Sequence, residues 1–427
     1  MKKTLVAIAA LASVSAFAQV TITGLMDAGP RISNIRGAAI TQITANNSAT
    51  SNITFLGKED LGGGLTANLR WELDVNPAQT AAMTQGTPAS PDNANIANYG
   101  GNGYSFVGLT SASAGTINFG TINTATLDAN GIGNPFGTAI GSGYKVVAIA
   151  ATRYQQAFEY ITPTMSGFSA KGLIAFKDDK QNLGATSSIP ASAGQQTNNG
   201  RDSVQEFSLK YSQGPLNLIA ANLRTTSYYS ASQNGAACTA APTAATTTTT
   251  GNNALGSLGN TCVDGANYTV NTIAGNYKVG NLTGYAWLQT QKQDSQANVY
   301  GSSLADPLAV VDRTAKGFAV TWEQSPALKL HAGYRQIQRN NGETYATNGQ
   351  TVTATTPVAG GIGQVTKMTA FGADYALSKL SSVYVRYEAI TDAAMLSNTL
   401  AVSGSGYSTS MTNNKITNLG AGLRVNF

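Results

Sequence analysis

Short and long connections alternate strictly along the chain, and this alternation constrains the fold more than any other feature. Seven short turns occur near residues 60–63, 111–114, 163–166, 213–215, 279–281, 325–326 and 377–379. Eight longer polar segments lie near 31–51, 76–103, 123–152, 178–200, 227–265, 292–311, 340–363 and 392–414. Together they separate sixteen segments, and their alternation predicts a meander of antiparallel hairpins.

The segments between these connections have the period of β-strands. In residues 65–74, Leu, Ala, Leu, Trp and Leu alternate with Thr, Asn, Arg, Glu and Asp. Residues 327–335 and 419–427 repeat the same alternation of apolar and polar side chains. Because successive side chains of a strand point to opposite faces, each strand has one apolar face and one polar face.

A sheet of sixteen antiparallel strands must protect its two edges. An exposed edge promotes aggregation, and in lipid an open edge is excluded because its backbone groups find no partner. Aromatic residues occur near strand ends on the apolar face, at Tyr211, Trp322, Tyr375, Tyr387 and Phe427. These features predict an all-β, 16-stranded antiparallel transmembrane β-barrel with a polar lumen and long external loops. A secreted β-sandwich or adhesin is the alternative, but it has no need for alternating connection lengths.

The composition excludes several other classes of protein. Charged residues make up 11% of the 427 residues, against roughly 25% in ordinary soluble domains. No run of 18 apolar residues occurs beyond the N-terminus, as a membrane-spanning helix requires. With 1 His and 2 Cys, the chain offers no recognisable metal-ligand set, and we expect neither a metal nor a cofactor. A net charge of +5 gives no reason to expect nucleic acid as a partner.

The N-terminus has the pattern of a secretory signal peptide. Lys2 and Lys3 precede a short, mostly apolar stretch that ends in Ala16, Phe17 and Ala18. This order of a basic region, an apolar region and small residues predicts cleavage after Ala18. Residues 1–18 are therefore expected to be removed, and residues 19–427 to form a single barrel domain in an oxidising compartment.

Several stretches from the start of the mature chain to its end carry a family resemblance. They are VTITGLMDAG at 20–29, FLGKEDLGGGL at 55–65, GTINFG at 115–120, GADYALSK at 372–379 and GLRVNF at 422–427. In their order, and with the terminal Phe427, they resemble the trimeric general-diffusion porins of Gram-negative outer membranes, in the β-proteobacterial branch. The resemblance implies a homotrimer in the outer membrane, in contact with its lipid and lipopolysaccharide. It also implies a water-filled channel for passive diffusion of small hydrophilic solutes and ions.

The third long segment is the one that the resemblance implies to fold into the pore. Residues 121–152 contain several glycines and one proline, which permit a tight inward path. Asp128 is the only acidic residue of this segment, and Lys145 is its basic one. We therefore expect Asp128 to lie at the pore constriction.

Basic side chains of inward parity are candidates for the wall opposite that loop. They are Arg31, Arg70, Arg386 and Arg424, and the family resemblance adds Arg153, which directly follows the third long segment. Such a wall facing Asp128 would produce a transverse field, and we expect a mildly anion-selective channel. Some of these residues could instead bind lipopolysaccharide at the rim or pair locally.

Cys238 and Cys262 lie 24 residues apart in one long segment of an exported chain. Two cysteines in this context are expected to form a disulfide, and two free thiols are the alternative.

Three functions remain to be separated. The leading one is passive diffusion without chemistry, and a solute-specific channel of the same fold is the first alternative. A secreted adhesin or a barrel enzyme is the second alternative. His331 is the only imidazole, and catalysis would require a nucleophile and an orienting acid beside it. We expect His331 to line the lumen and the protein not to be an enzyme.

Overall fold

The fold is taken from a computed structural model that describes residues 19–35, 38–78, 103–143, 153–176, 203–230, 262–293, 312–340, 365–392 and 415–427. Seventeen antiparallel strands and one helix lie within these ranges, and all the strands belong to one sheet. The elements are β1 (Gln19–Ile35), β2 (Ala38–Ala45), β3 (Asn52–Gly62), β4 (Leu65–Asp74), β5 (Ser105–Ser111), β6 (Gly115–Asn123), α2 (Ala125–Ile132), β7 (Arg153–Ile161), β8 (Phe168–Ala175), β9 (Ser203–Gln213), β10 (Leu216–Ser230), β11 (Cys262–Val279), β12 (Leu282–Gln293), β13 (Asp312–Glu323), β14 (Leu328–Arg339), β15 (Val365–Ala376), β16 (Ser381–Asp392) and β17 (Lys415–Asn426).

The sheet closes on itself between its first and last strands. On one edge β1 pairs with β17, where Leu25 lies opposite Asn426. On its other edge β1 pairs with β3 over residues 19–25 and with β2 over residues 28–35. Since β2 and β3 share one edge of β1, they occupy a single place in the barrel wall. The predicted 16-stranded barrel is therefore confirmed, with one extra strand.

The extra strand corrects one expectation from the sequence. Residues 31–51 were expected to form an ordinary long connection between strands. Instead, β1 continues to Ile35 and β2 returns along it, so that among the described residues of this segment those at 46–51 leave the wall. The sequence concealed the strand because Ile40 and Ile43 fall on opposite faces, so residues 38–45 lack the regular alternation of the other strands.

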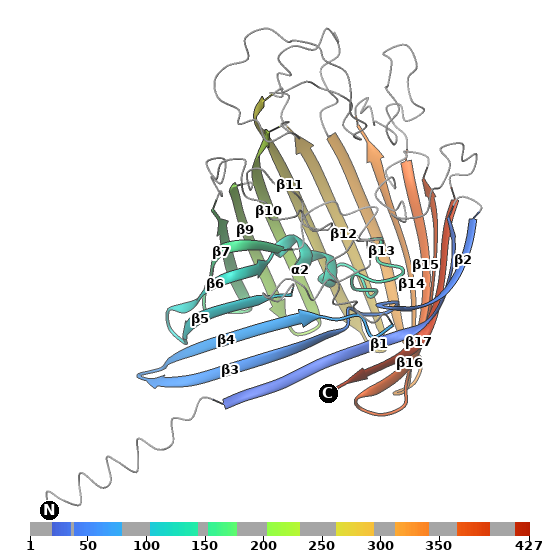
Figure 1. Ribbon diagram of the computed structural model, residues 1–427, viewed down its shortest axis with the longest axis horizontal. Coiled ribbons are helices and arrows are strands. Elements are labelled where there is room, and N and C mark those ends of the chain that lie inside the picture. Colours follow the sequence, from blue (N-terminus) through green and yellow to red (C-terminus); the bar gives the residue numbers. More distant parts are fainter. Residues whose placement is uncertain are drawn as a thin grey trace, which may run out of the picture.

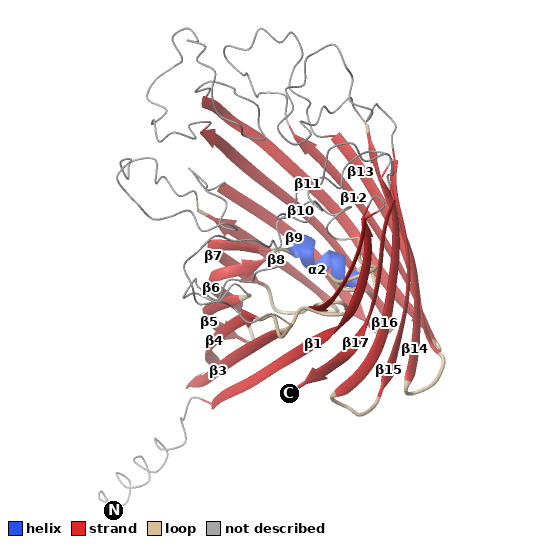
Figure 2. Ribbon diagram, turned by 45° about the vertical axis from the view of Figure 1, so that its right-hand side comes forward, coloured by secondary structure: helices blue, strands red, loops and turns tan. Residues whose placement is uncertain are grey.

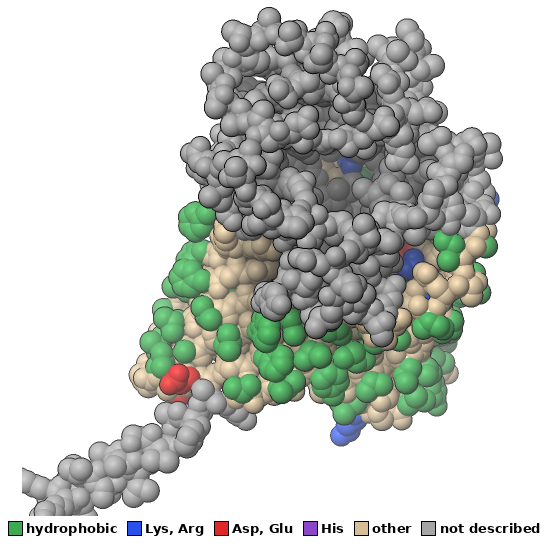
Figure 3. All heavy atoms as spheres, in the orientation of Figure 1, with side chains coloured by type: hydrophobic (Ala, Val, Ile, Leu, Met, Phe, Trp, Pro, Cys, Tyr) green, Lys and Arg blue, Asp and Glu red, His purple; other side chains and the backbone are tan. Residues whose placement is uncertain are grey.

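The short turns all lie at one end of the barrel, where the chain also ends (Figures 1 and 2). The outer wall carries the apolar side chains, and they cover much of the lower wall in Figure 3. Phe318 and Phe371, for example, are 64% and 56% exposed on this wall. Their neighbours along the strand, Ala319 and Ala370, face inward and are buried. The alternation read from the sequence thus separates a lipid face from a lumen face.

The segment after β6 turns into the barrel. Residues 124–143 form α2 and an irregular stretch that crosses the lumen, and α2 lies inside the barrel in Figure 2. The inward third loop is therefore confirmed. Across the described ranges, no helix is long and apolar enough to span a membrane.

Candidate functional site: the pore lumen

Two groups cap the N-terminus of helix α2, the hydroxyl of Thr124 and the carboxylate of Glu206 in the barrel wall. The Thr124 hydroxyl accepts a hydrogen bond from the N–H of Leu127 at 3.2 Å. The Glu206 carboxylate on β9 accepts the N–H of Ala125 at 2.6 Å and that of Thr126 at 2.9 Å. The hydroxyl of Thr126 donates to the same carboxylate at 2.9 Å. A carboxylate at a helix N-terminus is favourable because the first N–H groups have no partner within the helix.

The end of α2 is pressed against the wall. A Cβ placed on Gly133 would lie 2.9 Å from Cβ of Trp287 and 3.0 Å from that of Ala274, so only glycine permits this approach. Beyond it, the Asn134 side chain accepts the N–H of Phe136 at 2.7 Å and shapes the next turn. The sequence pattern of glycines in this loop therefore reflects close packing as well as turning.

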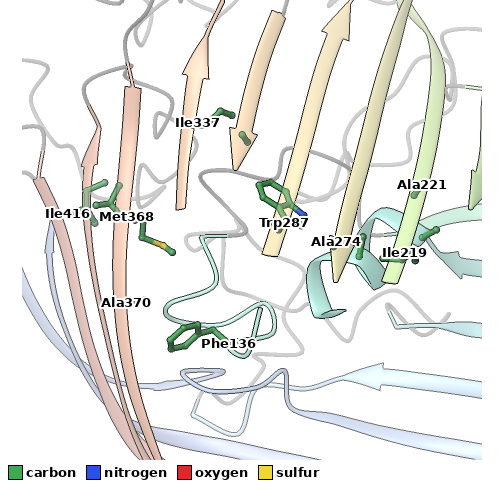
Figure 4. Packing of buried hydrophobic residues seen from close by; sticks show 13 residues of the cluster. Phe136, Ile219, Ala221, Ala274, Trp287, Ile337, Met368, Ala370 and Ile416 are labelled. Atoms are coloured by element: carbon green, nitrogen blue, oxygen red, sulfur yellow. The ribbon is translucent and has the colours of Figure 1, made fainter. Parts of the chain in front are cut away.

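Phe136 projects from the middle of the loop (Figure 4) and is buried against the barrel wall. It is 2% exposed, and its ring meets His331 edge-on with 5.9 Å between ring centroids. The guanidinium of Arg386 lies 5.7 Å from the centre of the same ring. Gly333 and Gly372 leave the space that the ring fills. The loop is thus held by a buried aromatic side chain as well as by hydrogen bonds.

The far end of the loop reaches the wall near the closure of the barrel. The N–H of Gly141 donates to Glu388 on β16 at 2.7 Å. The N–H of Ile140 donates to the carbonyl of Asn47 at 3.3 Å. The loop therefore joins the wall at β9, at β14 to β16 and at the inward turn between β2 and β3.

That inward turn, residues 46–51, is built around one carboxylate. Asp27 on β1 accepts the N–H groups of Ser48 and Ala49, each at 2.7 Å. The hydroxyl of Tyr384 donates to the other oxygen of Asp27. Asp27 is fully buried in this arrangement. Its role in holding a second inward segment was not foreseen from the sequence.

Arg70 lies on the opposite wall, on the lumen face of β4. It forms an ion pair with Glu72, two residues along the same face. Its guanidinium lies 5.4 Å from the ring centre of Tyr104, whose hydroxyl donates to Glu159 at 2.6 Å. Burial, together with the negative charge of Glu159, raises the pKa of Tyr104, so the phenol keeps its proton and remains the donor.

Arg153 begins β7 beside Arg70. Its guanidinium lies 3.0 Å from Asp74 and 3.9 Å from Glu72, and its Nε donates to Asn123 at 2.9 Å. The two arginines and two carboxylates thus form one charged cluster on β4 and β7. About a quarter of each arginine side chain remains exposed, 30% for Arg70 and 22% for Arg153.

Asp128 lies in the first turn of α2. Its side chain is 45% exposed and pairs with Lys171 on β8 at 3.1 Å. Lys171 also lies 3.4 Å from Glu159. The structure therefore brings Asp128 to a lysine that the sequence analysis did not single out.

Arg386 lies beneath Phe136 with only 2% of its side chain exposed. Its guanidinium forms an ion pair with Asp374 at 2.7 Å. Nε2 of His331 lies 2.8 Å from the same carboxylate. The other ring nitrogen of His331 lies 2.9 Å from the Thr321 hydroxyl. His331 and Arg386 therefore form part of the buried support for the loop.

Arg31 and Arg424 lie on the neighbouring strands β1 and β17. Arg31 donates to Ser33 and to Asn418, both at 3.0 Å, and Arg424 donates to Ser48 at 3.2 Å. Both side chains are partly exposed, and neither forms an ion pair with a described residue. They differ in this respect from Arg70, Arg153 and Arg386.

The match to a protein family decides what kind of lumen this is. The family model for Gram-negative porins matches residues 4–394. The chain belongs to the Gram-negative porin family. It is an outer-membrane porin whose barrel forms a diffusion channel, and porins are channel proteins rather than enzymes.

Solved structures share the fold of this porin at low sequence identity. The anion-selective porin from Comamonas acidovorans matches with a TM-score of 0.63 and 16% identity, over 96% of this chain and 100% of that one. In vitro folded OmpT of Vibrio cholerae matches with a TM-score of 0.57 and 14% identity, over 96% and 98%. OmpF of Salmonella typhi, in complex with daunomycin, gives a TM-score of 0.57 and 14% identity, over 96% and 98%. Among curated proteins, none matches this porin.

One lumen arginine of this porin was not among the predicted site residues. Arg335 on β14 is 3% exposed, donates to Asn130 of α2 at 2.7 Å, and stacks 4.6 Å from the ring centre of Trp287. Its inward parity with His331 was visible in the sequence. Its contact with the loop was not, because Asn130 lies 205 residues away.

Some expected features fall outside the described residues of this porin. They are the signal peptide at 1–18, Lys145 and Cys238, and the side chain of Cys262 is likewise not described. The signal peptide and the disulfide remain predictions. Within the described ranges, no group of three His, Cys, Asp or Glu side chains could hold a metal ion.

Proposed function

We propose that this porin is a general diffusion channel with a mild preference for anions. The observation that carries the proposal is the unequal pairing of charges in the lumen. Arg31 and Arg424 are partly exposed and have only neutral hydrogen-bond partners among the described residues. A cation of this kind attracts anions into a water-filled pore.

The inward carboxylates, by contrast, are engaged by the loops. Glu206 accepts two backbone N–H groups from α2, and Asp27 accepts two from the inward turn. Glu388 accepts the N–H of Gly141 and the side-chain amide of Asn418, the latter at 2.7 Å. Donors aimed at a carboxylate offset the negative potential that it projects into the lumen. The free charge left to act on passing ions is therefore mainly positive.

One structural neighbour points in the same direction. The Comamonas acidovorans porin is described as anion-selective, and its fold is similar to that of this chain. At 16% identity the likeness adds support but does not replace the charge argument.

The proposed constriction comprises Arg70 and Arg153 on one wall and Asp128 on α2, with Arg31 and Arg424 near the barrel closure. Arg386, proposed from the sequence as part of the same set, acts here by supporting Phe136 from below. Arg70, Arg153 and Asp128 are each partly exposed, so the basic wall and the loop present these charges to the water-filled lumen.

Reversal potentials in a potassium chloride gradient test the selectivity. The wild-type channel should favour chloride, and Arg31→Gln together with Arg424→Gln should reduce that preference. Lys379→Gln, in a short turn outside the lumen, is the control and should change little. A reversal potential that favours potassium in the wild-type channel would overturn the proposal.

Single-channel conductance distinguishes general diffusion from a solute-specific channel. Conductance that rises in proportion to salt and is not blocked by sugars or small carboxylates supports general diffusion. Saturation by one solute at low concentration would instead identify a specific channel.

We also propose that the porin acts as a homotrimer in contact with outer-membrane lipid and lipopolysaccharide. The structure of Vibrio cholerae OmpT described as a trimer form supports the assembly through its similar fold. An oligomer in mild detergent that converts to a single monomer band on heating would support the homotrimer. A monomer at every temperature would refute it.

A further inference from the structure

The upper outer wall of the barrel carries an ordered row of cations. Strand pairing places Lys316 opposite Gln336, Gln336 opposite Lys367, Lys367 opposite Thr391, and Thr391 opposite Lys415. The row therefore crosses β13 to β17 with a lysine on every second strand. Neighbouring strands lie about 4.8 Å apart, so consecutive lysines are spaced by about 10 Å.

All three lysines point outward and are exposed. Their neighbours along the strand, Ala315, Thr366 and Ile416, are buried on the lumen side. The lysines therefore have no part in the pore, and their charge acts on whatever surrounds the barrel.

The row lies directly above the apolar wall, toward the long connections. On β13, Phe318, Val320 and Trp322 are exposed apolar residues, and Lys316 is the next outward position after Phe318. The same change occurs on β15, where Phe371 is followed by Thr369 and then Lys367. In an outer-membrane barrel this end faces the cell exterior, so the row meets the headgroups of the outer leaflet.

Negative charge is scarce around the row. On β14 to β17, no described Asp or Glu has outward parity. On β13, Asp312 lies four residues beyond Lys316 and accepts a hydrogen bond from Asn340 at 2.8 Å. Lys316 and Lys367 form no ion pair with a described residue.

An open furrow in the outer wall begins beside Lys316. Its volume is about 540 Å³, and small residues form its floor while larger apolar side chains form its sides. The floor is at Gly275, Gly284 and Ala286, and the sides are at Leu218, Tyr277 and Leu288. Leu288 lies directly opposite Lys316 in the strand pairing, so the furrow adjoins the cationic row.

We propose that this row and furrow bind a lipid of the outer leaflet that bears more than one phosphate group. The lysines hold the phosphates, and the furrow receives an acyl chain. Ammonium groups bind phosphate oxygens through charge-assisted hydrogen bonds. At a spacing of about 10 Å, neighbouring lysines can each hold a separate phosphate of one lipid. The inference rests on the membrane placement of the porin but not on its selectivity.

Native mass spectrometry of the detergent-solubilised porin, with diphosphoryl lipid A as the probe, tests the site. Lys316→Gln with Lys367→Gln should weaken binding about 25-fold, at about fivefold for each lysine near an anionic lipid surface. Monophosphoryl lipid A should bind more weakly to the wild-type protein and lose less in the double variant. Lys379→Gln, in a short turn at the opposite end, is the charge control.

A second variant tests the furrow without removing charge. A Cβ on Gly284 would meet nothing within 4 Å, so Gly284→Leu fills the furrow without disturbing the strand. It should also weaken binding of the lipid. Gly172→Leu is the matched control, since Gly172 has equal space on the outer wall of β8, away from the lysines.

Three outcomes overturn the proposal. If the double lysine variant bound the lipid as well as the Lys379→Gln control, the row would have no part in the binding. If Gly284→Leu and Gly172→Leu weakened lipid binding equally, the furrow would have no part in the binding. A weakened oligomer with unchanged lipid binding would make the row a contact between subunits. Conductance, measured on the same samples, tests the channel function separately.

Discussion

The carboxylate of Glu206 on β9 receives the backbone N–H of Ala125 at 2.6 Å and so fixes the first turn of α2 to the barrel wall. The contact joins residues 81 positions apart in the chain. The same carboxylate also accepts the N–H and the hydroxyl of Thr126, so one wall side chain makes three hydrogen bonds to the start of the inward loop. The width of the pore therefore depends on a carboxylate of the wall as well as on the loop itself.

Glu206→Gln should loosen α2 while leaving the barrel intact. The amide keeps the size of the side chain, but it loses the charge and presents one NH₂ group toward backbone donors. The cost to the attachment should be about 1–2 kcal/mol. Single-channel recordings should show more frequent current fluctuations than the wild type. Glu59→Gln, on an exposed part of β3, is the control, and equal noise in both variants would contradict the prediction.

Phe136→Ala should detach the middle of the loop. The ring is 2% exposed between His331 and Arg386, and its loss would leave a cavity. Truncation of a buried phenylalanine costs about 3–5 kcal/mol. The loop should withdraw from the wall, so the single-channel conductance should change and the melting temperature should fall.

The matched control for Phe136→Ala is Phe371→Ala. Phe371 lies on the outer wall of β15, next to Gly372, and is 56% exposed. Its truncation removes the same atoms on the lipid side and should leave conductance unaltered. Identical conductance in the two variants would show that Phe136 does not position the loop.

The barrel could be predicted from the sequence because its signals are local. Alternation of apolar and polar side chains is readable within any ten residues, as in 65–74, and connection lengths are readable from turn residues. The extra strand β2 escaped prediction because its apolar and polar residues do not alternate regularly. Ile40 and Ile43 fall on opposite faces, so no single apolar face marks residues 38–45 as part of the wall.

In the lumen, the faces of the side chains could be predicted but their partners could not, for a different reason. Parity is a local property, and it was enough to assign Arg70 and Arg386 to the inner face. Their pairing with acids depends on strand register and on the path of the loop. Thus Asp374 was not recognised as the partner of Arg386, twelve residues away across a hairpin. Nor was Lys171 recognised as the partner of Asp128, because that contact joins two segments 43 residues apart.

The predicted disulfide between Cys238 and Cys262 can be tested by thiol chemistry. Intact protein under denaturing conditions should resist alkylation until reductant is added. The double variant Cys238→Ser with Cys262→Ser should be less stable by up to about 3 kcal/mol. Wild type treated with reductant should show the same loss. Labelling of two thiols without reductant would show that the bond does not form.

Asp128→Asn should increase the preference of the channel for anions. The carboxylate is 45% exposed on the lumen side of α2, and its removal also frees Lys171 from one of two acidic partners. One unit charge acts on a monovalent ion 10 Å away in water with about 0.4 kcal/mol, a factor of about two in local concentration. The ratio of chloride to potassium permeability should therefore rise by roughly two- to fourfold, since the charge acts oppositely on the two ions. Asp60→Asn, in an exposed short turn, removes the same charge far from the loop and should leave the ratio unchanged. A fall in the ratio for Asp128→Asn, or equal shifts in both variants, would show that Asp128 does not act on the ion path.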